Sequence, residues 1–330
     1  MILDETQDNN YLNQIRNGTL QQGLGIGCDL DNHYLFKSNE FDVFAGHANV
    51  GKTDWVIWHR VALSVKHSLS FLIFSSENRI GGLKRKIIEY KTGRNLEDLN
   101  EEDFNEANRW MNFKFKFVDT SQLYTARELI QVFVDNKDMF DGVVLDPYNS
   151  LKREGGQNGH EYDYEIASEF RLFCKNYNKN LMIVAHGVTE ALRKKHPQGD
   201  LVYIRNIAYD VGGHPIPLSA ADIEGGGKWV NRCDNFIVGH RYTQHEEKIW
   251  SSTLIHVRKI KETETGGRPT VLDKPIPCEK WHQTFSVNGK NPLQQPNEIH
   301  DKTNAILEAR KKEDKEIDEW KITPEDDLPF

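Results

Sequence analysis

A glycine-rich segment that ends in a lysine and a threonine follows the apolar run Phe41–Ala45. It reads Gly-His-Ala-Asn-Val-Gly-Lys-Thr and fits the pattern GxxxxGK[ST]. In such a loop the backbone N–H groups surround phosphate oxygens, the lysine reaches the terminal phosphates, and the hydroxyl binds Mg²⁺. The alternative is an ordinary glycine turn. The residues predicted to bind ATP or another nucleoside triphosphate are Gly46, Ala48, Asn49, Val50, Gly51, Lys52, Thr53 and Asp54.

Two carboxylates that follow apolar runs suit the chemistry of a nucleotide bound with Mg²⁺. Asp146 ends the run Gly142–Asp146, and we expect it to hold the metal together with Thr53. Glu77 follows the run that ends at Phe74, and we expect it to activate the water that attacks the terminal phosphate. Taken alone, Asp146 can simply begin the turn after its strand, and Glu77 can be a solvated surface group.

Short apolar runs alternate with longer mixed segments from Phe41 onward. Continuous apolar runs are typical of strands that are buried on both faces, and the intervening segments are long enough for helices. The pattern therefore predicts an α/β fold with a mostly parallel central sheet flanked by helices. The predicted strands lie in 41–46, 69–78, 140–147, 181–187, 233–241 and 252–260.

The composition is that of a folded protein. Of the 330 residues, 38% are hydrophobic and 10% are aromatic. This aromatic fraction is too high for a disordered chain. The formal net charge of −8 argues against a protein that coats duplex DNA by global attraction, but it does not exclude a local basic channel. Part of the negative charge lies in residues 301–330, which hold ten Asp or Glu and six Lys or Arg.

Cysteine spacing and the amino terminus indicate the compartment. The four cysteines lie far apart without a CxxC pair, which argues against a disulfide framework and against a zinc ribbon. The first residues are acidic and polar, without the basic and apolar regions of a signal peptide, and no run is long enough to span a membrane. We therefore expect a cytoplasmic protein with reduced thiols at Cys28, Cys174, Cys233 and Cys278.

Taken in order, these motifs resemble the RecA-like motor domain of hexameric replicative helicases, the group that contains DnaB, Twinkle and the phage primase-helicases. The likeness extends from about Gly23 to Val287. It rests on the lead-in GLGIGCDLD, the GxxxxGK[ST] loop, the strand end FSSEN, the turn KTGRNL, the segment LDPYNSL, the strand end IVAHG, the stretch DIEGGGKWVNRCDNFIVGHR and the strand VRKIK. The resemblance implies a RecA-like P-loop ATPase core.

The resemblance gives roles to individual residues of the ATP site. Glu77 lies where the family has its catalytic glutamate, and Asp146 where it has the metal-binding aspartate. His186 matches the γ-phosphate sensor, although a single histidine after an apolar run is more often a core or turn residue. Arg241 matches an arginine that lies against the nucleotide base, and its alternative is a surface ion pair.

Two segments lie where the family lines its central channel with strand-binding loops. Lysine, arginine and backbone N–H groups of glycines suit the phosphates of single-stranded DNA and do not read bases. The alternative for the first segment is a solvated charge run, and we expect Trp229 to pack rather than to stack on bases. The residues predicted to bind the strand are Arg193, Lys194, Lys195, Gly225, Gly226, Gly227 and Lys228.

The chain departs from the family at Lys259-Ile260-Lys261. Relatives carry Lys-x-Arg there, with the arginine reaching into the ATP site of the neighbouring subunit. Lys261 places a positive charge on the phosphate without the bidentate fork of a guanidinium. RecA-type recombinases use a similar Lys-x-Lys pair, so the departure bears on unwinding more than on an ATPase shared between subunits. We therefore expect catalytic roles for Lys259 and Lys261.

The sequence thus predicts an arm that links subunits at 1–22, with a helix over Asn10–Leu20, a motor domain at 23–291 and a charged tail at 292–330. We expect an ATP- and Mg²⁺-dependent single-stranded DNA translocase and replicative helicase, a hexameric ring encoded by a phage. The tail ends in PEDDLPF, which resembles the acidic tip of bacterial single-stranded-DNA-binding proteins. This tip suits a docking ligand for a replisome protein such as a polymerase or primase, or else a solubilising tail.

Two other functions are compatible with the same motifs. The first is a RecA-like recombinase or mediator that forms filaments on single strands, which Lys259 and Lys261 favour. The second is a RecA-fold regulatory ATPase that does not bind DNA.

Overall fold

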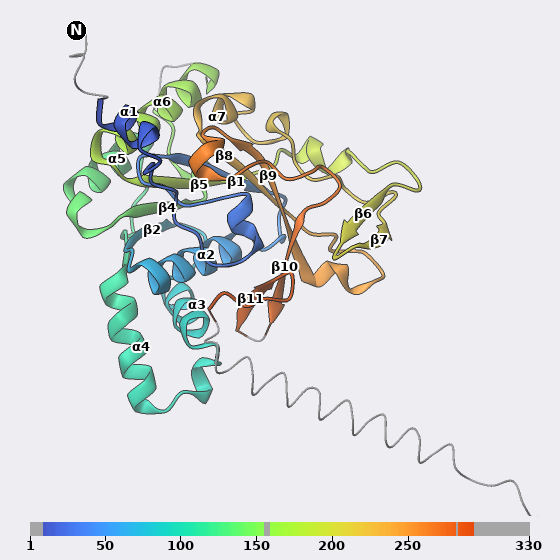
Figure 1. Ribbon diagram of the computed structural model, residues 1–330, viewed down its shortest axis with the longest axis horizontal. Coiled ribbons are helices and arrows are strands. Elements are labelled where there is room, and N and C mark those ends of the chain that lie inside the picture. Colours follow the sequence, from blue (N-terminus) through green and yellow to red (C-terminus); the bar gives the residue numbers. More distant parts are fainter. Residues whose placement is uncertain (1–8, 155–158, 282, 294–330) are drawn as a thin grey trace, which may run out of the picture. The chain divides into compact units, whose positions relative to one another are not determined.

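The computed structural model describes residues 9–154, 159–281 and 283–293. Its centre is a nine-stranded sheet in the order β11-β10-β9-β8-β1-β5-β4-β2-β3 (Figure 1). These strands are β1 (Phe41–Gly46), β2 (Phe71–Ser75), β3 (Phe115–Phe117), β4 (Gly142–Asp146), β5 (Asn180–His186), β8 (Asn235–His240), β9 (Ser252–Ile260), β10 (Ile276–Trp281) and β11 (Thr284–Val287).

The sheet is parallel from β3 through β2, β4, β5 and β1 to β8, and antiparallel from β8 to β11. The predicted mostly parallel α/β fold is therefore confirmed, and each of the six predicted strands is present. The run 252–260 forms β9, which lies antiparallel to its neighbour β8. Sequence analysis did not predict the short strand β3 or the final hairpin of β10 and β11.

Helices cover both faces of the sheet (Figure 1). Side chains alternate between the two faces along a strand. Phe41, at one end of β1, meets Phe170 and Trp229 of α6 and α7, whereas Phe44 stacks on Trp55 of α2, with ring centroids 4.8 Å apart. The helices are α1 (Asn9–Arg16), α2 (Lys52–His67), α3 (Ile80–Thr92), α4 (Glu101–Lys114), α5 (Ala126–Asp135), α6 (Gly159–Tyr177), α7 (Gly227–Arg232) and α8 (Thr263–Gly266).

Local side chains fix where two of these helices begin. The Asn100 side chain accepts a hydrogen bond from the backbone N–H of Asp103 and caps α4. Thr125 and Glu128 each accept a hydrogen bond from the backbone N–H of the other, which forms a capping box at the start of α5. Such caps satisfy N–H groups that have no partner inside the helix, so these boundaries are set by the sequence itself.

A small hairpin, β6 (Leu201–Ile204) and β7 (Ile207–Asp210), lies between β5 and β8 in the chain and forms a separate two-stranded sheet. Its turn residues, Arg205 and Asn206, both have positive φ angles, as a two-residue hairpin turn with the twist of its strands requires. The sequence analysis did not predict this hairpin, since β7 lacks a continuous apolar run.

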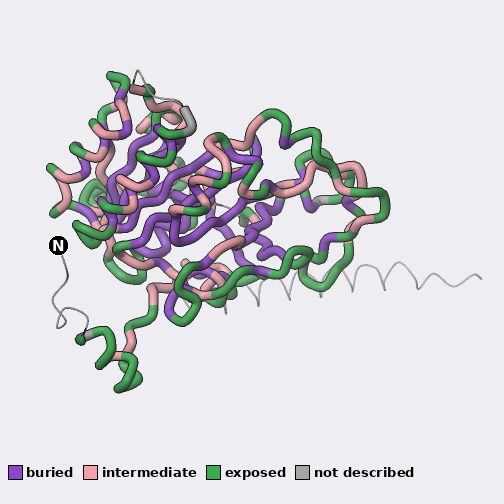
Figure 2. The backbone as a smooth tube through the Cα atoms, turned by 90° about the horizontal axis from the view of Figure 1, so that it is seen from above, coloured by how far each residue is buried: buried purple, intermediate pink, exposed green. Residues whose placement is uncertain are grey.

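Burial follows the sheet, whose strands are mostly buried, while connecting segments and the amino-terminal arm are exposed (Figure 2). The predicted helix of the arm is present as α1, where Tyr11, Leu12 and Ile15 are exposed. All four cysteines are buried and free. Within the described residues, no helix combines the length and the apolar character that a membrane span needs. The predicted tip PEDDLPF lies outside the described residues.

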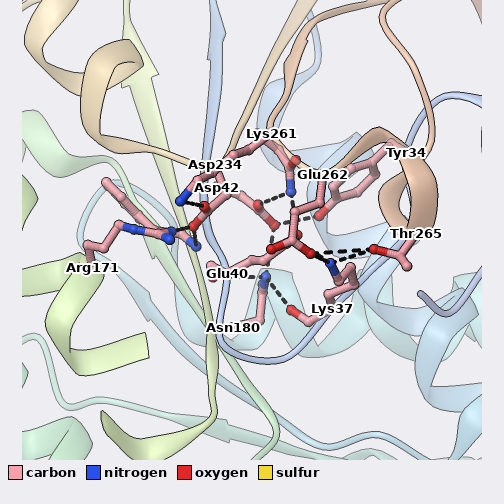
Figure 3. Close-up of polar contacts among 12 residues, drawn as sticks. Tyr34, Lys37, Glu40, Asp42, Arg171, Asn180, Asp234, Lys261, Glu262 and Thr265 are labelled. Carbon is pink, nitrogen blue, oxygen red and sulfur yellow. Dashed lines mark hydrogen bonds and ion pairs between the residues drawn. The ribbon is translucent and has the colours of Figure 1, made fainter. Parts of the chain in front are cut away.

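Asp42 joins the beginnings of the three central strands. It is fully buried near the start of β1 and accepts hydrogen bonds from Asn180 of β5 at 2.9 Å and from Asn235 of β8 at 2.7 Å. The hydroxyl of Tyr34 donates a third hydrogen bond, at 2.7 Å. One carboxylate therefore fixes the relative positions of β5, β1 and β8 at their amino-terminal ends (Figure 3).

We predict that Asp42→Ala lowers the free energy of unfolding by about 3 kcal/mol or more, since it leaves buried donors without an acceptor. Urea denaturation followed by tryptophan fluorescence measures this loss. The matched control is Asp138→Ala, whose side chain is 89% exposed and whose loss should stay within about 0.5 kcal/mol. Equal effects of the two substitutions would contradict the role of Asp42.

Candidate functional site

The predicted phosphate loop connects β1 to α2. Gly51 has a φ of 82° and immediately precedes Lys52, the first residue of α2. A β-carbon at Gly51 would lie 2.8 Å from a guanidinium nitrogen of Arg241 and 3.2 Å from Oγ1 of Thr253, so backbone angle and packing both favour glycine. The loop therefore presents the amino terminus of a sixteen-residue helix, where backbone N–H groups are free to bind an anion.

Thr53 and Asp146 meet at the expected metal site. The Thr53 hydroxyl donates a hydrogen bond of 2.6 Å to Oδ2 of Asp146, which joins the start of α2 to the end of β4. A hydroxyl and a carboxylate side by side are the hard oxygen ligands that Mg²⁺ takes when phosphates and water complete its shell. These two residues therefore fit the metal, which would neutralise phosphate charge when bound.

Lys52 and Glu77 lie at the two ring nitrogens of His186. The ammonium of Lys52 donates to the carbonyl of His47 at 2.8 Å and lies 3.4 Å from Nδ1 of His186. Because the lysine is a donor, Nδ1 of His186 accepts and its proton is carried on Nε2. That nitrogen faces Oε2 of Glu77 at 3.8 Å, which is beyond hydrogen-bond distance.

Burial sets the protonation of this group. It lowers the pKa of His186, an effect that the charge of Lys52 strengthens, so the imidazole is neutral at pH 7. It also lowers the pKa of Lys52, while the carboxylates of Asp146 and Glu77 raise it. Burial raises the pKa of Asp146 to about 6, against the hydrogen bond from Thr53 and the charge of Lys52. A phosphate would therefore meet a lysine and a neutral histidine.

Arg241 lies at the end of β8, beside the phosphate loop. Its guanidinium donates to Oγ1 of Thr253 at 2.6 Å, and Thr253 in turn donates to the carbonyl of Val50. Burial lowers the pKa of Arg241, and the charge of Asp54 raises it. Arg241 also lines a cavity of about 220 Å³ together with His47 and His240. The predicted contact of Arg241 with the base stays a prediction.

The two predicted strand-binding segments lie against each other. Lys194 forms an ion pair with Asp222, and the backbone N–H of Val188 donates to the Asp222 carbonyl. Arg193 pairs with Glu190 of the same short helical turn, and both side chains are at least 70% exposed. The structure thus brings the segment around Arg193 and the segment around Gly225 into one surface, with Lys194 engaged inside it.

The glycine segment 225–227 lies next to the buried indole of Trp229. Gly225 has a φ of 84°, and a β-carbon there would overlap the ring nitrogen of Trp229. Trp229 is fully buried and packs on Tyr148 and Phe170, which confirms the prediction that it is a packing residue. Gly226 and Gly227, by contrast, have open space where a side chain would begin.

Asn149 and Glu224 connect the predicted phosphate site to this surface. Sequence reasoning included Glu224 in the second strand-binding segment but gave Asn149 no role. The N–H of Glu224 donates to the carbonyl of His186, at 3.2 Å. The side-chain amide of Asn149 donates to the Glu224 carboxylate, and its oxygen lies 3.5 Å from the N–H of His186. The signal available in the sequence was the position of Asn149, three residues after Asp146 in the turn beyond β4.

Lys259 and Lys261 lie elsewhere, at the end of β9. Because β9 is antiparallel to β8, its carboxyl end lies at the amino-terminal edge of the parallel strands, opposite the phosphate loop. Lys259 donates to the carbonyls of Val230 and Cys233, and Lys261 lies 3.4 Å from Oδ1 of Asp234. The structure therefore does not bring either lysine to the phosphate loop of its own chain.

The chain is similar to several known proteins. It is 24% identical to "Twinkle homolog protein, chloroplastic/mitochondrial" of Arabidopsis thaliana over 265 aligned residues, which cover 74% of this chain. The chain spans about a third of the length of that relative, 34%. No protein-family model matches the chain.

Two solved structures share the fold. The first is an isolated ATPase domain, which superposes with a TM-score of 0.63 at 12% identity and covers 86% of this chain and 99% of that domain. The second is a DnaB-like replicative helicase, solved in a study of its interactions with primase, with a TM-score of 0.61 at 13% identity over 86% of this chain and 67% of the other. The RecA-like fold that the sequence predicted is thereby confirmed.

We predict that Thr53→Val weakens nucleotide binding at least about tenfold in Mg²⁺ and leaves binding in EDTA unchanged, since only the metal ligand is lost. Fluorescence titration with an ATP analogue under both conditions measures the difference. Thr92→Val is the matched control, because the Thr92 hydroxyl donates to a carbonyl of its own helix, α3. Equal weakening with and without Mg²⁺ would show that Thr53 has another role.

Proposed function

We propose that this chain, whose RecA-like domain is of the DnaB and Twinkle type, is the motor of an ATP-dependent replicative DNA helicase. It would bind ATP with Mg²⁺ at the Lys52 loop and single-stranded DNA at the surface around Arg193 and Gly225. Ring assembly, with six subunits, and translocation along the strand belong to the same proposal. The phage origin and the cytoplasmic location stay predictions from the sequence.

The observation that carries the proposal is the position of His186 between the two surfaces. Its ring lies beside Lys52, and its backbone carbonyl accepts a hydrogen bond from Glu224, the residue before the glycines. A group that contacts the terminal phosphate on one side and the loop on the other can pass a change at the phosphate to the loop. A motor needs such a link, because hydrolysis must change its affinity for the DNA strand.

The chemistry follows from the carboxyl edge of the sheet. Glu77 is half exposed, with 58% of its side chain accessible, so it can reach a water molecule above the terminal phosphate. It would orient this water and take its proton as the oxygen attacks phosphorus and the bond to the bridging oxygen breaks. Lys52 would neutralise charge on the phosphate, and neutral His186 would donate a hydrogen bond.

The protein would bind single-stranded DNA through the phosphates of the DNA. The exposed side chain of Arg193 and the open backbone at Gly226 and Gly227 are suited to phosphate oxygens, without contacts that would read a base. Lys194, Lys195, Gly225 and Lys228 remain part of the proposed surface, although Lys194 already pairs with Asp222. Binding should therefore depend on salt and hardly on sequence.

The arm, the tail and the two lysines of β9 complete the proposal. The exposed apolar residues of α1 suit a contact with an adjacent subunit, as expected for the arm at 1–22. Lys259 and Lys261 would act toward the ATP of a neighbouring subunit, which agrees with their distance from the phosphate loop of their own chain. A replisome partner would bind the tip PEDDLPF.

We predict that Lys52→Ala abolishes ATP-dependent separation of a forked DNA duplex, because the ammonium that neutralises the phosphates is lost. The wild-type protein is assayed in parallel, and hydrolysis is recorded with and without single-stranded DNA. Substantial unwinding by the variant would refute the proposal. Strand-stimulated hydrolysis without unwinding by the wild type would favour the recombinase or mediator, and hydrolysis indifferent to DNA would favour the regulatory ATPase.

We predict that Asn149→Ala lowers the ratio of DNA-stimulated to basal hydrolysis by about tenfold, a coupling free energy of about 1.4 kcal/mol, because it removes the side chain that joins Glu224 to the end of β5. Steady-state hydrolysis with increasing single-stranded DNA measures the ratio. Asn112→Ala, on the exposed side of α4, is the control. An unchanged ratio in the Asn149 variant would show that the coupling takes another route.

A further inference from the structure

A second charged group lies at the amino-terminal edge of the parallel strands, away from the phosphate loop. Its centre is Asp234, which immediately precedes β8 and whose side chain is 3% exposed. Oδ2 of Asp234 accepts the backbone N–H of Phe41 at 3.0 Å, and its backbone carbonyl accepts the N–H of Lys261 at 3.0 Å. The main chain of Phe41 therefore holds the carboxylate, and the main chain of Lys261 holds the backbone of the same residue.

Two cations from different elements share this carboxylate. Lys261, at the end of β9, approaches Oδ1 at 3.4 Å, and Arg171 of α6 forms an ion pair with Oδ2 (Figure 3). Their side chains remain 29% exposed for Arg171 and 50% exposed for Lys261. A single carboxylate neutralises only one of them, so this trio by itself carries one positive charge in excess, although Nη1 of Arg171 is buried.

Other charged side chains lie around this trio (Figure 3). Lys259 directs its ammonium inward to the carbonyls of Val230 and Cys233. Lys37 pairs with Glu40 at 3.1 Å and with Glu262 at 2.5 Å, and the charges of Lys37 and Lys261 both lower the pKa of Glu262. Arg171 and Lys261 therefore share one carboxylate and keep part of their side chains exposed.

We infer that Arg171 is the arginine that acts with Lys261 on the ATP of a neighbouring subunit. This inference rests on the proposed function. A guanidinium fork matches phosphate oxygens in pairs, which a lysine cannot do, and Lys259-Ile260-Lys261 contains no arginine. The fold supplies the missing group from α6 and places it beside Lys261 on the same carboxylate. Asp234 is then a positioning residue that holds both cations.

The step needs no covalent role for Arg171. Water adds to the γ-phosphorus, its proton passes to Glu77 of the subunit that binds the ATP, and the bond to the bridging oxygen breaks. Negative charge accumulates on the phosphate oxygens during this step. Arg171 and Lys261 of the adjacent subunit would donate hydrogen bonds to these oxygens and stabilise the charge.

Mixing two inactive variants tests whether Arg171 acts between subunits. Arg171→Gln alone should lower DNA-stimulated hydrolysis by about 10³-fold, with unchanged affinity for a fluorescent ATP analogue and unchanged oligomer mass. Lys52→Ala should be inactive by itself. When the two are mixed in equal amounts, about a quarter of the head-to-tail interfaces pair an intact phosphate loop with an intact Arg171. Hydrolysis should then recover to roughly that fraction of the wild-type rate.

Two further variants keep the test decisive. Arg171→Lys retains the charge beside Asp234 in case the glutamine variant does not fold, and it too should lose rate and recover on mixing. Arg232→Gln is the matched control, because its guanidinium lies 4.1 Å above the ring of Tyr164, also on α6. This control should keep wild-type hydrolysis within about twofold, since surface substitutions change little.

The outcomes separate this inference from the proposed function. Normal hydrolysis by Arg171→Gln would overturn the inference, and so would a loss that mixing does not restore, because Arg171 would then act within its own chain. Either result would leave the helicase proposal standing. A wild-type protein without hydrolysis or without an oligomer would overturn both. Recovery on mixing, with the Arg232 control unaffected, supports the role of Arg171.

Discussion

The hydrogen bonds that converge on Asp42 constrain the rest of the structure. This carboxylate joins the beginnings of β1, β5 and β8 through Asn180 and Asn235. A shift of one residue between two strands would turn every side chain to the wrong face, so the pairing register stays the same along the strands. Strands that are aligned at their amino-terminal ends are therefore also aligned at their carboxyl ends. Gly46 therefore lies opposite His186 at the carboxyl edge. The meeting of the phosphate loop with the end of β5 depends on this alignment.

The two edges of the sheet use buried acidic residues differently. At the amino edge, burial raises the pKa of Asp42, and side chains of the fold supply its hydrogen bonds. At the carboxyl edge, Asp146 is also buried, yet its side-chain hydrogen bond is to Thr53, a second ligand suited to Mg²⁺. A carboxylate that the fold has satisfied stabilises structure, whereas one that faces a loop and another oxygen ligand is available for a metal.

The sequence predicted those parts of the site that lie at strand ends. Gly46, Asp146 and His186 each end a continuous apolar run, and parallel strands bring such ends to one edge. Asp42 and its partners leave no comparable pattern, since they lie 138 and 193 residues apart in the chain. The contact of Asn149 with Glu224 joins two turns, so neither periodicity nor spacing indicates it. The hairpin of β6 and β7 was missed for a similar reason.

The start of β8 connects the aligned central strands to the edge that is proposed to face an adjacent subunit. Asn235 donates to Asp42 and so helps to align the central strands, while its neighbour Asp234 binds Arg171, Lys261 and the N–H of Phe41. Two consecutive residues thus tie the edge proposed to face an adjacent subunit to the first residue of β1. β1 is a short, buried strand that ends at the phosphate loop. A force on Arg171 or Lys261 would therefore act on the strand that leads to the proposed ATP site of the same chain.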